Sequence, residues 1–142
     1  VARVFLKPGR GQFIVNGKSV TLVSAVVKAT KDSFDASKTG YTLILSDVPG
    51  LPDKYGSLDK VTAGTLHFVE VTLGHDKSVY GAILHHNACQ NNTVTTAGTV
   101  KFEAEKFGPD ALAGKVSMPA KTFEGATYQF TATFTAPVEK DK

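Results

Sequence analysis

Cysteine is almost absent from this chain of 142 residues, in which Cys89 is the single example. One thiol cannot close a disulfide within the chain, and it cannot by itself supply the several thiolates of a structural zinc cluster. A nucleophilic cysteine would also need a neighbouring base and an oriented third group, and no motif near Cys89 indicates an oxyanion hole. We therefore expect no internal disulfide and a free thiol without a catalytic role.

Arginine is also scarce, because Arg3 and Arg10 are the only two among the 16 basic residues. The lysines are scattered among 13 acidic residues, so the formal net charge of +3 does not describe a basic segment. Recognition of phosphates and base edges favours the bidentate guanidinium group of arginine. We therefore interpret the lysines as solvated surface residues, and we expect no nucleic-acid partner.

Long hydrophobic runs are missing as well. The longest, residues 20–27, is interrupted by Thr21 and Ser24, whereas a helix needs about 20 apolar residues to span a bilayer. This pattern predicts no membrane span. Because the chain begins at Val1 instead of Met, and because threonine and small residues are frequent, we expect a secreted or periplasmic protein after signal removal.

What the sequence does contain is a series of short β-type segments separated by turn residues. With 42% hydrophobic residues over one domain's length, we expect a single domain covering residues 1–142. Turn residues recur at intervals of roughly 8 to 15 residues, and between residues 51 and 64 a helix of one or two turns at most is expected. The pattern predicts an antiparallel β-sandwich, Ig-like or Greek-key, of about eight to nine strands, with a β-barrel as the alternative.

Two segments carry sharp structural expectations. Asn16-Gly17 lies between two β-rich runs, so we expect a two-residue type I′ hairpin with Val15 and Lys18 as its flanking pair. Residues 127–135 alternate strictly, and we expect their even-numbered side chains to face the core.

The histidines are the chemically suggestive residues. A five-residue loop, 74–78, joins two predicted strands at 65–73 and 79–86. In the register that this loop length favours, His67 faces His85 across the hairpin. Directly opposed side chains in a sheet have Cβ atoms about 4.5 to 5.5 Å apart, close enough for two imidazoles to share a divalent transition metal.

Such a metal site would need a third ligand, for which Cys89 is the candidate after a turn of the chain. The competing interpretation is that His67 and His85 are half-buried residues paired in ordinary sheet packing. His75 falls in the predicted turn, where we expect it to be solvated. Aspartates such as Asp32 also fall mainly in predicted turns, where aspartate caps the backbone.

Three segments of the chain resemble, in order, uncharacterised exported bacterial β-sandwich proteins of about this length. They are Phe13-Ile14-Val15-Asn16-Gly17-Lys18-Ser19-Val20, Gly64-Thr65-Leu66-His67-Phe68-Val69-Glu70-Val71 and Tyr128-Gln129-Phe130-Thr131-Ala132-Thr133-Phe134-Thr135-Ala136-Pro137. The resemblance implies export and a β-sandwich fold. It carries no activity and no functional residues.

Two functional hypotheses follow. The first is an exported, non-enzymatic binding or structural module that contacts an unknown protein or cell-envelope partner, without a cofactor. The sequence contains no convincing catalytic set, and its β-sheet must protect its edges. The alternative is a metal-binding protein that uses His67 and His85, with Cys89 as a further ligand and a divalent transition metal as the cofactor.

Overall fold

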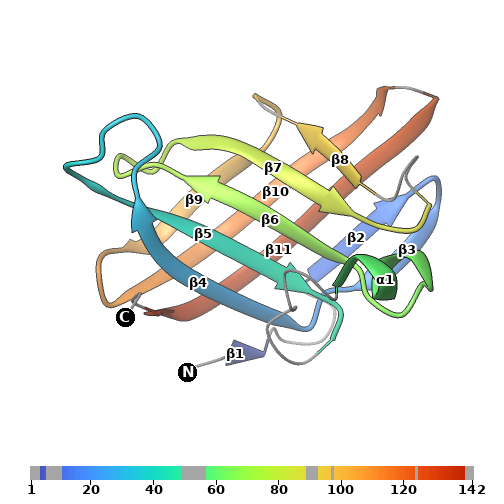
Figure 1. Ribbon diagram of the computed structural model, residues 1–142, viewed down its shortest axis with the longest axis horizontal. Helices are drawn as coiled ribbons and strands as arrows, with labels where there is room; N and C mark the ends of the chain where they lie inside the picture. Colours follow the sequence, from blue (N-terminus) through green and yellow to red (C-terminus); the bar gives the residue numbers. More distant parts are fainter. Residues whose placement is uncertain are drawn as a thin grey trace.

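Strands make up most of the protein in the computed structural model, which describes residues 4–5, 11–48, 57–88, 93–96, 98–123 and 125–139 (Figure 1). The elements in chain order are β1 (Val4–Phe5), β2 (Gly11–Val15), β3 (Lys18–Thr21), β4 (Ser24–Lys31), β5 (Thr39–Ser46), α1 (Ser57–Thr62), β6 (Phe68–Leu73), β7 (Val79–His85), β8 (Thr93–Thr96), β9 (Lys101–Phe107), β10 (Ala111–Phe123) and β11 (Ala126–Glu139). The all-β prediction is confirmed.

The strands belong to one large sheet, mixed but mostly antiparallel. Its path runs β3-β2-β11-β4-β5-β6-β7-β8, with β10 and β9 branching from β11 and with β1 on β4. The junction of β11 with β4, at Val138 and Val27, is parallel. Among the described residues, β3 and β8 end the path without pairing with each other, so the sheet is not closed and the β-barrel alternative is wrong.

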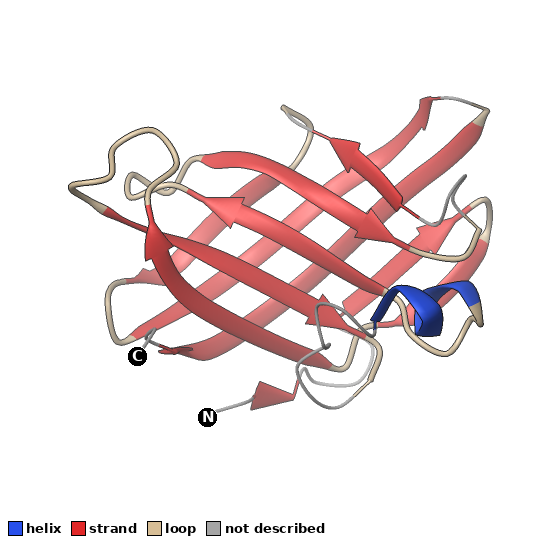
Figure 2. Ribbon diagram, in the orientation of Figure 1, coloured by secondary structure: helices blue, strands red, loops and turns tan. Residues whose placement is uncertain are grey.

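The strands lie in two crossing groups around a common core. In Figure 2, strands β4 to β7 run across the front of β9, β10 and β11. One hydrophobic cluster takes buried side chains from both groups, including Leu43 and Val71 from the first and Phe13 and Phe130 from the second. Burial of these large side chains is the main stabilising contribution, because truncating a buried phenylalanine typically costs about 3 to 5 kcal/mol.

The predicted hairpin at Asn16-Gly17 is confirmed. Val15 pairs with Lys18, and the φ angles of Asn16 and Gly17 are 50° and 79°. Asparagine and glycine tolerate this left-handed conformation better than other residues, which is why the sequence signal at this turn is reliable. The Asn16 side chain also links this turn to the start of β11, because its Oδ1 accepts a hydrogen bond from the Thr127 N–H at 2.9 Å.

The predicted alternation in β11 is confirmed too. Its even-numbered residues are the buried ones, listed here with their exposures: Tyr128 1%, Phe130 2%, Ala132 0% and Phe134 3%. The odd-numbered side chains therefore project from the outer face of the sheet, where they meet outward-facing residues of β10 and β2.

The one helix in the described part of the chain is short, as expected for residues 51–64. Val61 of α1 packs in a small cluster with Ile44, Leu66 and Phe68, beside the end of β5. Among the described residues, no helix is long and apolar enough to cross a membrane.

Candidate functional site

The register of the β6–β7 hairpin differs by one residue from the predicted register. Leu73 lies opposite Val79 as expected, but Thr72 lies opposite Gly81, which leaves Tyr80 as an extra residue in β7. An extra residue of this kind is a β-bulge, and it displaces every pair that follows it.

The facing pair of His67 and His85 is therefore wrong. His85 lies opposite Phe68, and because adjacent residues of a strand point to opposite faces, His67 is on the other side of the sheet from His85. The imidazole that neighbours His67 is that of His86, with ring centroids 4.4 Å apart.

His67 is held by Asp47. The His67 N–H donates to Asp47 Oδ1 at 2.8 Å, and its ring Nδ1 lies 2.6 Å from Asp47 Oδ2. On the other side of the ring, Nε2 lies 3.3 Å from Asn87 Oδ1. Both ring nitrogens thus face oxygen atoms of neighbouring side chains.

His86 is almost completely buried, at 1% exposure, with its ring edge-on to Phe13 at 5.2 Å. Its Nδ1 accepts a hydrogen bond from the Ala88 N–H at 3.0 Å, so the neutral ring carries its proton on Nε2. Burial first, and then the charge of neighbouring His67, lowers the pKa of His86 from 6.5 to about 4, against an opposing contribution from the backbone of Lys18. This is a neutral core histidine at ordinary pH.

His85 is also a packed histidine. Its ring stacks on Phe68 with centroids 4.0 Å apart and planes 12° apart, and burial lowers its pKa from 6.5 to about 4. Its Nε2 lies 4.0 Å from Glu70 Oε2, and its Nδ1 lies 3.4 Å from the Thr93 hydroxyl. These contacts agree with the interpretation of His85 as a residue in ordinary sheet packing.

The role of these residues as metal ligands stays a prediction. Within the described ranges, no group of three or more His, Cys, Asp or Glu side chains is arranged to hold a metal ion. Cys89, the predicted third ligand, lies outside the described residues.

A second Asp–His pair lies at the opposite end of β5 and β6. Asp32, whose side chain is fully buried, accepts hydrogen bonds from the His75 N–H at 2.8 Å and from His75 Nδ1 at 2.6 Å. The Tyr80 hydroxyl donates to the same carboxylate at 3.0 Å, and the N–H groups of Phe34 and Asp35 also donate to it. The His75 N–H, as the largest contribution, holds the pKa of Asp32 well below its usual range.

The expectation that His75 is simply solvated is thus corrected: its side chain is one-third exposed and its Nδ1 is bound. The same cluster accounts for the shifted register. Tyr80 is the bulged residue, and its hydroxyl is held by Asp32, which is 48 positions away in the sequence. The two hairpin loops at this end of the sheet are therefore joined through one carboxylate.

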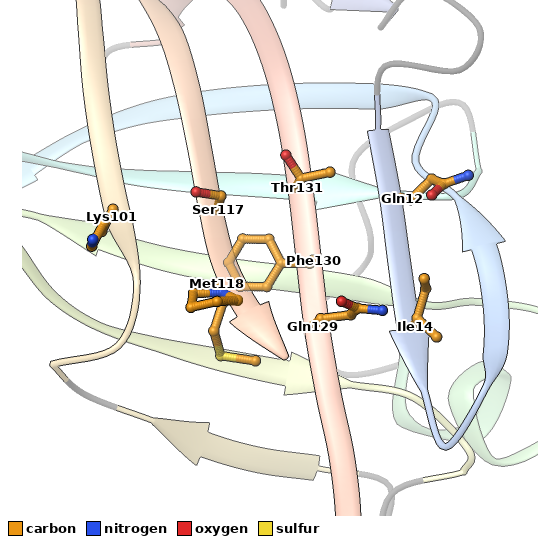
Figure 3. A pocket seen from close by; sticks show the side chains of 9 residues that line it. Gln12, Ile14, Lys101, Ser117, Met118, Gln129, Phe130 and Thr131 are labelled. Atoms are coloured by element: carbon orange, nitrogen blue, oxygen red, sulfur yellow. The ribbon is translucent and has the colours of Figure 1, made fainter. Parts of the chain in front are cut away.

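The outer face of the sheet carries a groove that no pattern in the sequence indicates, seen from close by in Figure 3. It encloses about 420 Å³ over β2, β10 and β11, with the start of β9 at one side. Its polar lining residues are Gln12, Lys101, Ser117, Gln129 and Thr131. Ile14 and Pro119 add apolar surface, and none of the lining residues in the described ranges is a carboxylate.

The polar groups of this groove are uncommitted. No hydrogen bond or ion pair joins any of the five side chains to another residue in the part of the chain that the structure describes. Elsewhere on this strand pair, the hydroxyls of Thr122 and Thr127 are hydrogen-bonded to each other at 2.8 Å. The groove therefore gathers free donors and acceptors in one concave place, which makes it a candidate for a ligand site.

When the chain is compared with protein families, with curated proteins and with solved structures, it matches none of them. The resemblance to exported bacterial proteins stays a prediction. The groove and the histidine clusters are therefore the features of this chain that bear on its function.

Proposed function

We propose that this protein is a non-enzymatic binding module and that the groove over β2, β10 and β11 is its ligand site. The observation that carries the proposal is the concentration of five uncommitted polar side chains in one hollow of about 420 Å³. Such groups are solvated in the free protein, and a ligand that replaces their water with matched hydrogen bonds gains affinity and orientation.

The histidine clusters support a non-enzymatic protein. A hydroxyl nucleophile is activated by a histidine nitrogen within about 2.6 to 3.2 Å. The Thr93 hydroxyl lies 3.4 Å from His85 Nδ1, and both nitrogens of His67 face oxygen atoms of other side chains. These contacts favour a packing role for the histidines.

The proposal also includes the type of β fold and the location of the protein. A β-sandwich of Ig-like or Greek-key type is supported by the two crossing groups of strands that share one hydrophobic core. A secreted or periplasmic location, with a protein or cell-envelope component as the partner, is supported by the composition and by the resemblance given above.

The test is a protein-observed NMR screen with glucose, acetamide, a Gly-Ser peptide and inorganic phosphate as probes. We expect at least one probe to shift the amide signals of Gln12, Ser117 and Thr131. We expect the variant Thr131→Leu, which fills the groove, to lose those shifts. The control Thr135→Leu, on the same face of β11 but outside the groove lining, should keep them. Shifts that gather elsewhere, or no shifts at all, would overturn the assignment of the groove.

A further inference from the structure

The groove contains a straight row of polar side chains that crosses four strands. Lys101 of β9 pairs with Ser117 of β10, Ser117 pairs with Thr131 of β11, and Thr131 pairs with Gln12 of β2. Paired residues of an antiparallel sheet project from the same face, and neighbouring strands lie about 4.8 Å apart, so the row spans about 14 Å.

The chemistry of the row excludes several ligand classes. A metal ion requires carboxylate, imidazole or thiolate ligands, and the described lining residues include none. A strongly anionic ligand favours the arginine fork, but among the lining residues that the structure describes only Lys101 is charged. A fully apolar ligand would bury amides and hydroxyls without partners, which is unfavourable.

A peptide bound by strand addition does not fit either. Strand addition requires an open sheet edge, where backbone groups are unpaired. The groove lies over β10 and β11 inside the sheet, where β11 is paired with β10 on one side and with β2 on the other. At Ser117 and Thr131 the backbone is paired with a strand on both sides, so the row offers its side chains for recognition.

Ligands rich in hydroxyl groups match what remains. Amides and hydroxyls each donate and accept, as sugar hydroxyls do, and Ile14 and Pro119 offer apolar surface to the C–H face of a sugar ring. Resting on the proposed function of the groove, we propose that its ligand is a linear oligosaccharide laid across the strands along this row. A hexose in an extended chain advances about 5 Å, close to the separation of neighbouring strands, so each sugar meets one polar side chain.

The test is isothermal titration calorimetry with cellohexaose, chitohexaose and maltohexaose, each compared with its disaccharide. We expect one hexasaccharide to bind at least about tenfold more tightly than its disaccharide, because a row of about 14 Å is longer than two sugars. Thr131→Val and Ser117→Ala each remove one hydroxyl, and each should weaken that binding about fivefold. The control Thr135→Val should leave it unchanged.

The outcomes separate this inference from the function on which it rests. If the Gly-Ser peptide or phosphate shifts the groove signals in the NMR screen and no hexasaccharide binds, the groove is a ligand site and the oligosaccharide proposal is wrong. If neither kind of probe reaches the groove, both proposals are wrong. Hexasaccharide binding that Thr131→Val and Ser117→Ala leave unchanged would also overturn the inference, because the sugar would then bind elsewhere.

Discussion

Acid should destabilise this protein through its buried histidines, and His85→Phe should remove a defined part of the effect. The pKa of His85 is lowered by burial from 6.5 to about 4 in the folded state, so the unfolded chain binds a proton at His85 more readily than the folded protein does. His85 therefore contributes its full share to the free energy of unfolding above pH 6.5. This contribution is lost as the pH falls from 6.5 toward 4.

The magnitude follows from the two pKa values. The difference between 6.5 and about 4 corresponds to about 3.4 kcal/mol for complete protonation, at about 1.36 kcal/mol per pH unit. Glu70, whose side chain is one-third exposed, lies 4.0 Å from His85 Nε2, and its negative charge partly offsets the cost of charging the buried ring. We therefore use roughly half of the full value, about 1 to 2 kcal/mol, for the contribution of His85 between pH 6.5 and 4.5.

Phenylalanine is a suitable replacement because His85 already stacks on Phe68 and its Nε2 has no hydrogen-bond partner in the described part of the chain. We expect His85→Phe to match the wild type at pH 7.5 within about 1 kcal/mol. Urea denaturation followed by circular dichroism at several pH values between 7.5 and 4.5 measures the free energy of unfolding. The variant should lose about 1 to 2 kcal/mol less than the wild type over this range.

The control is Ile83→Val, a change in the same strand that removes no titratable group. It should keep the wild-type dependence on pH, whatever its effect at pH 7.5. Identical pH dependence of the wild type and His85→Phe would refute the reasoning, as would an NMR titration in which the His85 ring takes up its proton near pH 6.5 in the folded protein.

Three further predictions concern the fold and the clusters that shape it. Gly17→Val should lower the free energy of unfolding by more than about 1 kcal/mol, because a β-branched residue resists the φ of 79°; an unchanged urea midpoint would contradict the turn. Phe130→Ala should cost about 3 to 5 kcal/mol, whereas Thr135→Ala in the same strand should stay within about 0.5 kcal/mol; comparable losses would contradict the assigned faces. Asp32→Asn should destabilise the protein at pH 7, and its difference from the wild type should shrink as the pH falls below about 3.8, because the Asp32 carboxyl then takes up a proton in the unfolded chain while its lowered pKa keeps it charged in the folded protein; a difference independent of pH down to 2 would show that the charge of Asp32 is unimportant.

Two features of the fold could be predicted from the preferences of neighbouring residues. The turn at Asn16-Gly17 depends on the φ preferences of two adjacent residues, and the buried face of β11 depends on the alternation of polar and apolar side chains within one segment. Neither requires knowledge of a distant partner. These features could therefore be predicted from the sequence alone.

The predicted histidine pair failed because its register depends on a distant contact. Loop length correctly placed Leu73 opposite Val79, but the next step in β7 is displaced by the bulge at Tyr80, whose hydroxyl is bound by Asp32. No local pattern in residues 74–86 indicates that contact. A slip of one residue was enough to exchange His85 for His86 as the neighbour of His67.

The groove could not be predicted either, because it also depends on how segments far apart in the sequence are aligned. Its row exists only because Thr131 lies in register with Gln12 on one side and with Ser117 on the other. Each of these residues alone is an ordinary outward-facing side chain of a sheet. The pairing of β11 with β2 joins segments more than 100 positions apart, and no turn fixes that register.

Both Asp–His pairs stabilise the same two strands, and this repetition bears on what the histidines do. Asp32 and His75 join the start of β5 to the end of β6, and Asp47 and His67 join the end of β5 to the start of β6. In each pair the carboxylate accepts both the backbone N–H and the Nδ1 of its histidine. One arrangement repeated at the two ends of a strand pair, with the carboxylate bound to the backbone each time, has the geometry of a structural clamp. His67 and His75 therefore hold β5 and β6 together at both ends, a structural role that agrees with the proposal of a ligand site in the groove and not at the histidines.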